Sequence, residues 1–200
     1  MITRRHTVGL LTLSIVSLYA GCGGLGNVNQ GQVIQYDKGA GLITLISDSN
    51  PSDPANPKFD VLPPVVVRVP ANNLEMGPTP RAGRLIDLDT RGQKMVVFDV
   101  PSQSLRTLPY EAVSQQVGVP KDDPRVKGKK LPAINHDSMT ITLYWQKRGV
   151  LLTFRAPPAY LALPEDAWRS GDTIRYYYKD PALALRLMNV SRTDLQNTGE

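Results

Sequence analysis

Few side chains of this 200-residue chain are of types that could do chemistry. His136 stands beside Asp137, but no Gly-x-Ser-x-Gly nucleophile motif accompanies the pair. Zinc needs three or four Cys, His or carboxylate ligands, which an isolated histidine does not supply. We therefore interpret His136 as an exposed turn residue. We predict no catalytic residue, no metal site and no cofactor, and thus a protein that is not an enzyme.

The segment 47–64 combines Asp and Asn residues in a way that superficially suggests calcium binding. It lacks both the glycine at the sharp turn and the closing bidentate glutamate of an EF-hand loop. Its residues, together with three interior prolines, are those of a turn-rich surface loop. We predict such a loop here.

The strongest chemical signal is Cys22, the only cysteine. The segment before it has the parts of an export signal: Arg4 and Arg5, an apolar run over 8–18, and the small residues Ala20 and Gly21. That run spans about 16 Å as a helix, too short to cross a bilayer core of about 30 Å. A cysteine directly after small residues is typical of the lipobox, which predicts lipidation of Cys22. Tyr19, where leucine is usual, leaves open an ordinary cleaved signal and an unanchored periplasmic protein.

A lipidated N-terminus would fix the location of the chain. Several acyl chains make membrane attachment stable, so we expect a bacterial cell-envelope protein that faces the periplasm, with the membrane as a partner through its lipid. Gly23 instead of Asp after the cysteine favours the outer over the inner membrane.

Composition narrows the classes of partner. The chain carries 23 basic and 18 acidic residues. Residues 1–21 contain two arginines and no acid, so the remainder has a net charge of only +3. This mild charge is not typical of nucleic-acid-binding proteins, which concentrate basic residues in a stripe. The 16 glycines and 17 prolines favour short strands and turns.

The pattern of strands repeats along the chain. Segments 33–37, 42–46, 65–69, 85–89 and 95–98 read as strands, and 104–108 could add another. Similar anchors recur about 100 residues later: Ile34 to Asp37 match Ile134 to Asp137, and Arg81-Ala82-Gly83 match Arg169-Ser170-Gly171. The recurrence predicts an internal duplication.

We therefore predict an all-β protein of two tandem five-stranded barrels, OB-like or SH3-like, because closing a small sheet removes its exposed edges. A single β-sandwich is the alternative. The predicted divisions are a signal peptide (1–21), a flexible tether (22–30), a first barrel (31–110), a linker (111–130), a second barrel (131–190) and a tail (191–200).

One strand offers a candidate partner surface. Tyr177 points to the face opposite Tyr176 and Tyr178, and aromatic rings with basic neighbours suit a protein or glycan partner. The residues of this candidate surface are Trp145, Arg175, Tyr177 and Lys179. Alternatively, Tyr176 and Tyr178 are core and Tyr177 is an isolated surface ring, and Trp145 has a core role.

The motifs GQVIQYDKGAGLITLISD, EMGP, VVFD, KDDP, YLALPEDAW and GDTIRYYYKDPALALRLMNVS, with the lipobox, resemble the DUF4881 family of uncharacterised bacterial lipoproteins. The resemblance implies an envelope location and carries no catalytic residues. The C-terminal half is also similar in plan to periplasmic copper-binding OB barrels, but Gln146, Lys147 and Arg148 stand where that family has His and Met. We expect a non-catalytic binding or scaffolding module; a metal or small-ligand carrier is the alternative.

Overall fold

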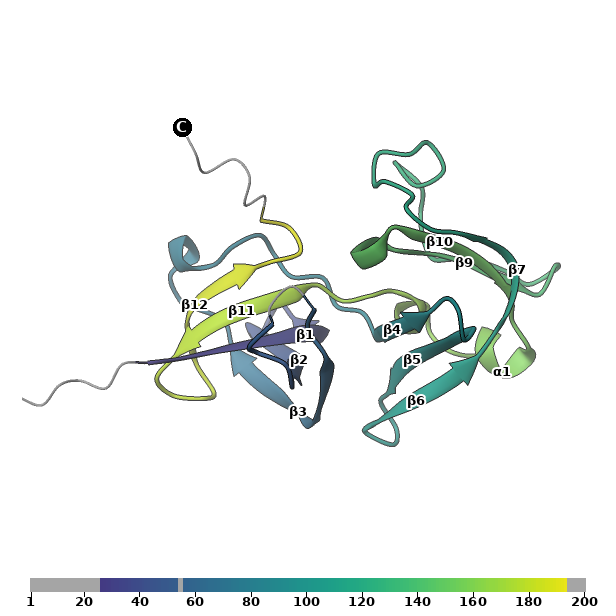
Figure 1. Ribbon diagram of the computed structural model, residues 1–200. Coiled ribbons are helices and arrows are strands. Elements are labelled where there is room, and N and C mark those ends of the chain that lie inside the picture. Colours follow the sequence, from purple (N-terminus) through teal and green to yellow (C-terminus); the bar gives the residue numbers. More distant parts are fainter. Residues whose placement is uncertain (1–25, 54–55, 194–200) are drawn as a thin grey trace, which may run out of the picture.

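The computed structural model describes residues 26–53 and 56–193, which fold into two lobes of β-structure (Figure 1). The first lobe, here the terminal lobe, is a five-stranded sheet. Its strands are, in order, β12 (Ala184–Asn189), β11 (Thr173–Tyr178), β1 (Asn27–Asp37), β2 (Leu42–Asp48) and β3 (Phe59–Arg68). The predicted signal peptide and Cys22 lie outside the described residues, as does most of the predicted tail. Residues 27–30 of the predicted tether form the start of β1.

The second lobe, here the central lobe, consists of two sheets that face each other. One contains β4 (Leu85–Asp89), β5 (Lys94–Asp99) and β6 (Ser104–Pro109); the other has the order β7 (Glu111–Gln116), β10 (Val150–Arg155), β9 (Thr140–Trp145), β8 (Ala133–Asn135). The helical segments are short: α1 (Pro158–Leu161) and the 3-10 turns η1 (Asn73–Glu75), η2 (Gln146–Arg148) and η3 (Glu165–Trp168).

Alternation of side chains explains how the strands bury their apolar residues. In β9, Ile141, Leu143 and Trp145 point inward, and their neighbours point toward the partly exposed face. They form one core with residues of β10 and of the hairpin β4–β5. The terminal lobe has a separate core that includes Val33, Leu45 and Ile174, all fully buried. The alternating burial along β9 is the period-two pattern of a half-buried strand.

The all-β class predicted from the sequence is confirmed, but the two tandem barrels are not what forms. Within the described residues none of the three sheets closes on itself, and the strands do not make a single sandwich. The terminal lobe pairs β1 with β11 in antiparallel register from Asn27↔Tyr178 to Gln32↔Thr173. Each lobe therefore contains strands from both predicted units, and β7 lies within the predicted linker.

The two halves have exchanged hairpins. The meander β1–β2–β3 is extended by the hairpin β11–β12 from the C-terminal half. The meander β8–β9–β10 instead shares its core with the hairpin β4–β5 from the N-terminal half. The two sets of similar strand patterns therefore do not correspond to two independent barrels.

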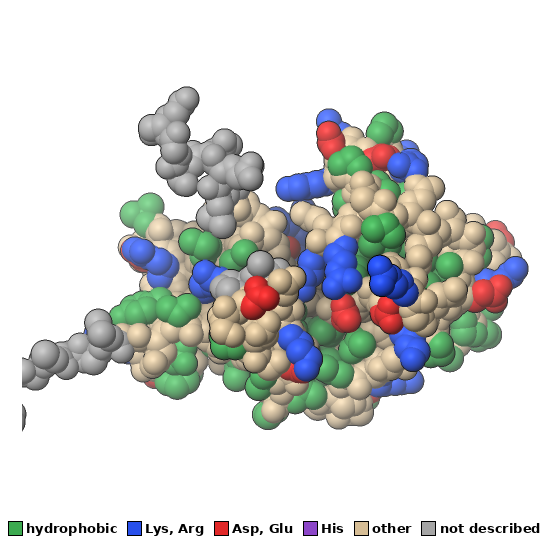
Figure 2. Space-filling model, in the orientation of Figure 1, with side chains coloured by type: hydrophobic (Ala, Val, Ile, Leu, Met, Phe, Trp, Pro, Cys, Tyr) green, Lys and Arg blue, Asp and Glu red, His purple; other side chains and the backbone are tan. Residues whose placement is uncertain are grey.

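A third cluster joins the lobes. Ile34, Ile46 and Phe59 of the terminal lobe pack against Ile86 and Phe98 of the central lobe. Around this seam, the space-filling view shows Lys and Arg side chains gathered where the lobes adjoin (Figure 2).

Candidate functional site

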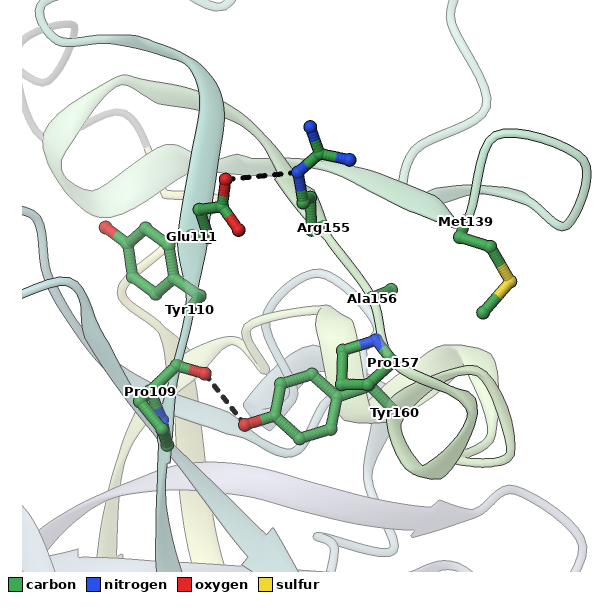
Figure 3. Close-up of a pocket in the computed structure, with 8 residues that line it drawn as sticks. All are labelled: Pro109, Tyr110, Glu111, Met139, Arg155, Ala156, Pro157 and Tyr160. Atoms are coloured by element: carbon green, nitrogen blue, oxygen red, sulfur yellow. Dashed lines mark hydrogen bonds and ion pairs between the residues drawn. The ribbon is translucent and has the colours of Figure 1, made fainter.

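An apolar pocket opens on the central lobe where β6 runs into β7, beside the end of β10 and α1 (Figure 3). Its volume is about 570 Å³. The lining residues are Pro109, Tyr110, Glu111, Met139, Arg155, Ala156, Pro157 and Tyr160. Aromatic rings, prolines and a methionine are the lining of sites that accept apolar groups.

The walls of this pocket are fixed by the core behind them. The Tyr160 ring packs against Trp168 with centroids 5.7 Å apart, and the Tyr110 ring against Phe154 at 5.8 Å. The Tyr160 hydroxyl donates a hydrogen bond to the Pro109 carbonyl at 2.7 Å, which ties α1 to β6. Burial raises the pKa of the Tyr160 hydroxyl, so it stays a protonated donor at neutral pH. The pocket is therefore preformed.

Two side chains of opposite charge lie at the rim of the pocket. Arg155 Nε donates to Glu111 Oε1 at 3.1 Å, and the two residues are cross-strand partners of β10 and β7. Figure 3 shows this pair above the pocket, with Tyr160 and Pro157 below it. Both side chains are exposed, so the pair contributes little to stability. It can instead offer a donor and an acceptor to the backbone of a bound segment.

The structure does not bring the four predicted surface residues together. Trp145 is 1% exposed and belongs to the core of the central lobe, because the alternation of β9 turns it inward. It is therefore not part of a partner surface, and only the Arg148 guanidinium lies over its ring, 5.4 Å from the centroid.

The other three predicted surface residues lie on or just after β11 in the terminal lobe. Arg175 donates to the Gln30 side chain at 2.9 Å, and the Tyr177 hydroxyl accepts from the Gly26 backbone at 3.1 Å. Lys179 is exposed in the following turn, whereas Tyr176 is 3% exposed and packs in the core. Arg175 and Tyr177 thus hold the start of β1 in place, and the core reading of Tyr176 is confirmed.

The predicted turn residues behave as expected. His136 is exposed in the turn after β8. The loop predicted over 47–64 is shorter in the structure, because β2 ends at Asp48 and β3 begins at Phe59. Asp48 is buried and accepts from the backbone N–H groups of Asn50 (2.9 Å) and Lys58 (2.7 Å). This carboxylate organises the loop. The described residues hold no group of three or more His, Cys, Asp or Glu side chains placed to bind a metal ion.

Sequence reasoning missed the pocket itself. Glu111 and Arg155 come from strands, Tyr110 lies between β6 and β7, and Tyr160 comes from a helix fifty residues after Tyr110. None of them belongs to a pattern that indicates a binding site. The pairing of β7 with β10 brings Glu111 to Arg155, and the Tyr160–Pro109 hydrogen bond brings α1 to β6.

The fold and the pocket define a two-lobed all-β protein with a preformed apolar site. The family model described as "Domain of unknown function (DUF4881)" matches residues 24–198, and the chain belongs to this family. Searches of curated proteins and of solved structures found no match. None of the helices in the described part of the chain is long and apolar enough to span a membrane.

Proposed function

We propose that this protein is a lipid-anchored bacterial envelope lipoprotein whose folded part is a non-catalytic binding module. The pocket of Figure 3 receives an apolar side chain of a partner protein, and the Arg155–Glu111 pair contacts the neighbouring backbone of that partner. The observation that carries this proposal is the preformed apolar pocket with both charges at its rim. Such pockets fix a ligand by apolar burial and a few placed polar groups.

Site-specific crosslinking tests the pocket. A photoreactive amino acid in place of Glu111 should give a discrete crosslinked protein in intact envelopes. The matched control replaces Leu74, which is 92% exposed on the terminal lobe. The substitution Met139→Asp places a charge in the apolar lining and should abolish the product, because burying an unpaired charge is costly. Identical products from both positions, or a product that survives Met139→Asp, would overturn the pocket assignment.

Metabolic labelling tests the anchor separately. The wild-type protein should incorporate a radioactive fatty acid and sediment with the outer membrane on a density gradient. Cys22→Ser should lose the label and leave the membrane fraction, since the acylated residue is gone. Continued labelling of Cys22→Ser would show that the anchor proposal is wrong, without bearing on the pocket.

A further inference from the structure

Three hollows follow one another across the seam between the lobes. The first, of about 440 Å³, has an apolar floor of Phe59 from β3 and of Ile86, Val96 and Leu105 from the central lobe. The second shares Pro57 and Lys147 with the first. The third, of about 230 Å³, shares Gln146, Ser170 and Asp172 with the second. Neighbouring hollows thus share lining residues, and we name the three hollows together the junction groove.

The junction groove gathers positive charge. Its lining includes seven cationic side chains: Lys58, Arg81, Lys121, Lys129, Lys147, Arg148 and Arg169. Only three acidic side chains line it: Asp60, Asp87 and Asp172. The excess is large for a chain whose residues beyond 21 carry a net charge of only +3. Charge is thus concentrated in this recess instead of being spread evenly over the molecule.

Two of the three carboxylates are already engaged. Asp172 accepts from Arg192 Nε and from the Asn189 amide, both at 2.8 Å, and from the Arg81 backbone at 2.9 Å. Asp60 pairs with Lys58 at 2.8 Å. Asp172 thus joins separate segments of the groove, whereas Asp60 is engaged by its near neighbour Lys58, so neither acid does much to neutralise the other cations.

The cations at the centre of the groove lack carboxylate partners. Among the described residues, neither Lys147 nor Arg148 forms an ion pair. The Lys147 ammonium lies 5.2 Å from the Phe59 ring centroid and donates to the Pro57 carbonyl at 3.3 Å. The Lys147 side chain is exposed, yet desolvation by the atoms around its ammonium lowers its pKa and outweighs the attraction of Asp87. A bound anion would offset this cost of holding the charge.

Hydrogen bonds and a close backbone contact fix the far end of the groove. The loop that carries Lys121 and Lys129 is fastened to the turn η2 through Val119. The Val119 N–H donates to the Gly149 carbonyl and the Tyr144 hydroxyl to the Val119 carbonyl, each at 2.8 Å. Gly149 has φ +59°, and a Cβ there would lie 2.6 Å from the Val119 carbonyl oxygen. The close approach therefore requires glycine at position 149. It places the loop that carries Lys121 and Lys129 beside η2.

We propose that the junction groove binds an acidic polysaccharide, a glycan chain that carries carboxylate, sulfate or phosphate groups. The succession of hollows suits an extended chain, and a recess between lobes does not suit the flat surface of a bilayer. The apolar floor fits the faces of sugar rings, and the unpaired cations fit their acidic groups. This site is distinct from the pocket of Figure 3, and the inference does not rest on that pocket.

The test measures binding of the purified protein to dextran sulfate, with neutral dextran of equal length as the reference. We expect binding of dextran sulfate alone, weakened by added salt as charges are screened. Lys147→Gln with Arg148→Gln should raise the Kd at least ten-fold, and so should Lys121→Gln with Lys129→Gln. The charge-matched control is Lys38→Gln with Lys94→Gln, two exposed sites outside the groove. It should leave the Kd within two-fold.

Each alternative result is decisive. An equal loss in the control pair would show that net charge, not the groove, drives binding, and would overturn the proposal. So would unchanged binding in both groove variants. Lys147→Arg retains the charge and should retain the affinity, which separates charge loss from misfolding. Binding to phosphatidylglycerol vesicles but not to dextran sulfate would assign the groove to a lipid surface. Equally tight, groove-dependent binding of a single-stranded oligonucleotide would assign it to nucleic acid; either result contradicts the polysaccharide.

Discussion

At the scale of single residues, the acidic side chains of this protein mainly organise backbone. Asp48 accepts two N–H groups of the loop after β2, and Asp172 joins the segment before β4 to the end of β12. The sequence showed these residues only as acids in turns. Their hydrogen-bond partners lie up to 91 positions away in the chain. The spacing of residues therefore did not reveal which carboxylates accept hydrogen bonds within the protein and which have no such partner.

The first prediction concerns Asp123, whose carboxylate pairs with the Arg125 guanidinium at 2.6 Å and accepts from its backbone N–H at 2.9 Å. These hydrogen bonds lower the pKa of Asp123 to about 2. Because the pKa of Asp123 is lower in the folded state than in the unfolded state, its ionised carboxylate stabilises the fold above the unfolded-state pKa of about 4. This stabilisation is lost as the pH falls through the folded-state pKa of about 2. Carboxyl NMR should show this midpoint. Arg125→Ala should move it up toward 3.8; an unchanged midpoint would contradict this account.

At the scale of elements, two glycines permit the chain to cross between lobes. Gly83 precedes β4 and Gly171 precedes β11, positions that the sequence pattern marked as equivalent. The Gly83 N–H donates to the Val33 carbonyl at 3.1 Å, and a Cβ on Gly171 would lie 1.8 Å from that same oxygen. The sequence pattern marked these glycines as matching positions. In the structure they lie where three backbone segments pack closely together, which leaves no room for a Cβ atom.

The second prediction follows from this crossing. Gly171→Ala should destabilise the protein by about 1–3 kcal/mol, the cost of overpacking a site whose neighbours are backbone atoms. Urea unfolding measures the change. Gly39→Ala is the control, because the added Cβ would meet only an exposed Asp37 oxygen at 3.4 Å, and it should stay within about 0.5 kcal/mol of wild type. Equal effects at the two glycines would exclude the close crossing.

At the scale of the whole molecule, the exchange of hairpins makes the two lobes interdependent. The terminal lobe needs the last two strands of the chain to complete the sheet around β1. The central lobe needs Leu85, Met95 and their neighbours from β4 and β5 to cover Phe154 and Trp168. Neither half of the sequence contains all the residues of either lobe's own core.

The third prediction is that neither half folds alone. Fragments 22–117 and 118–200 should each give collapsed, poorly dispersed NMR spectra, because each exposes an apolar face that the other half covers. Mixed during refolding, they should associate into a complex with the spectrum of the intact protein. A well-dispersed spectrum from either fragment by itself would show that a half is an independent domain after all.

The sequence by itself determined the class of secondary structure, most strand positions and the family. Residues 85–89 and 42–46 were found as strands because side-chain alternation is a local property. The start of β3 was missed because the whole segment 47–64 was interpreted as a turn-rich loop, and β7 was placed in a linker. Only the tertiary structure decided which hairpin joins which meander, that Trp145 is core, and where the pocket and the junction groove lie. Those features depend on strands far apart in the chain, such as β1 with β11 and β7 with β10. The pairing of such strands is set by the burial of complementary apolar faces and leaves no local signal in the sequence.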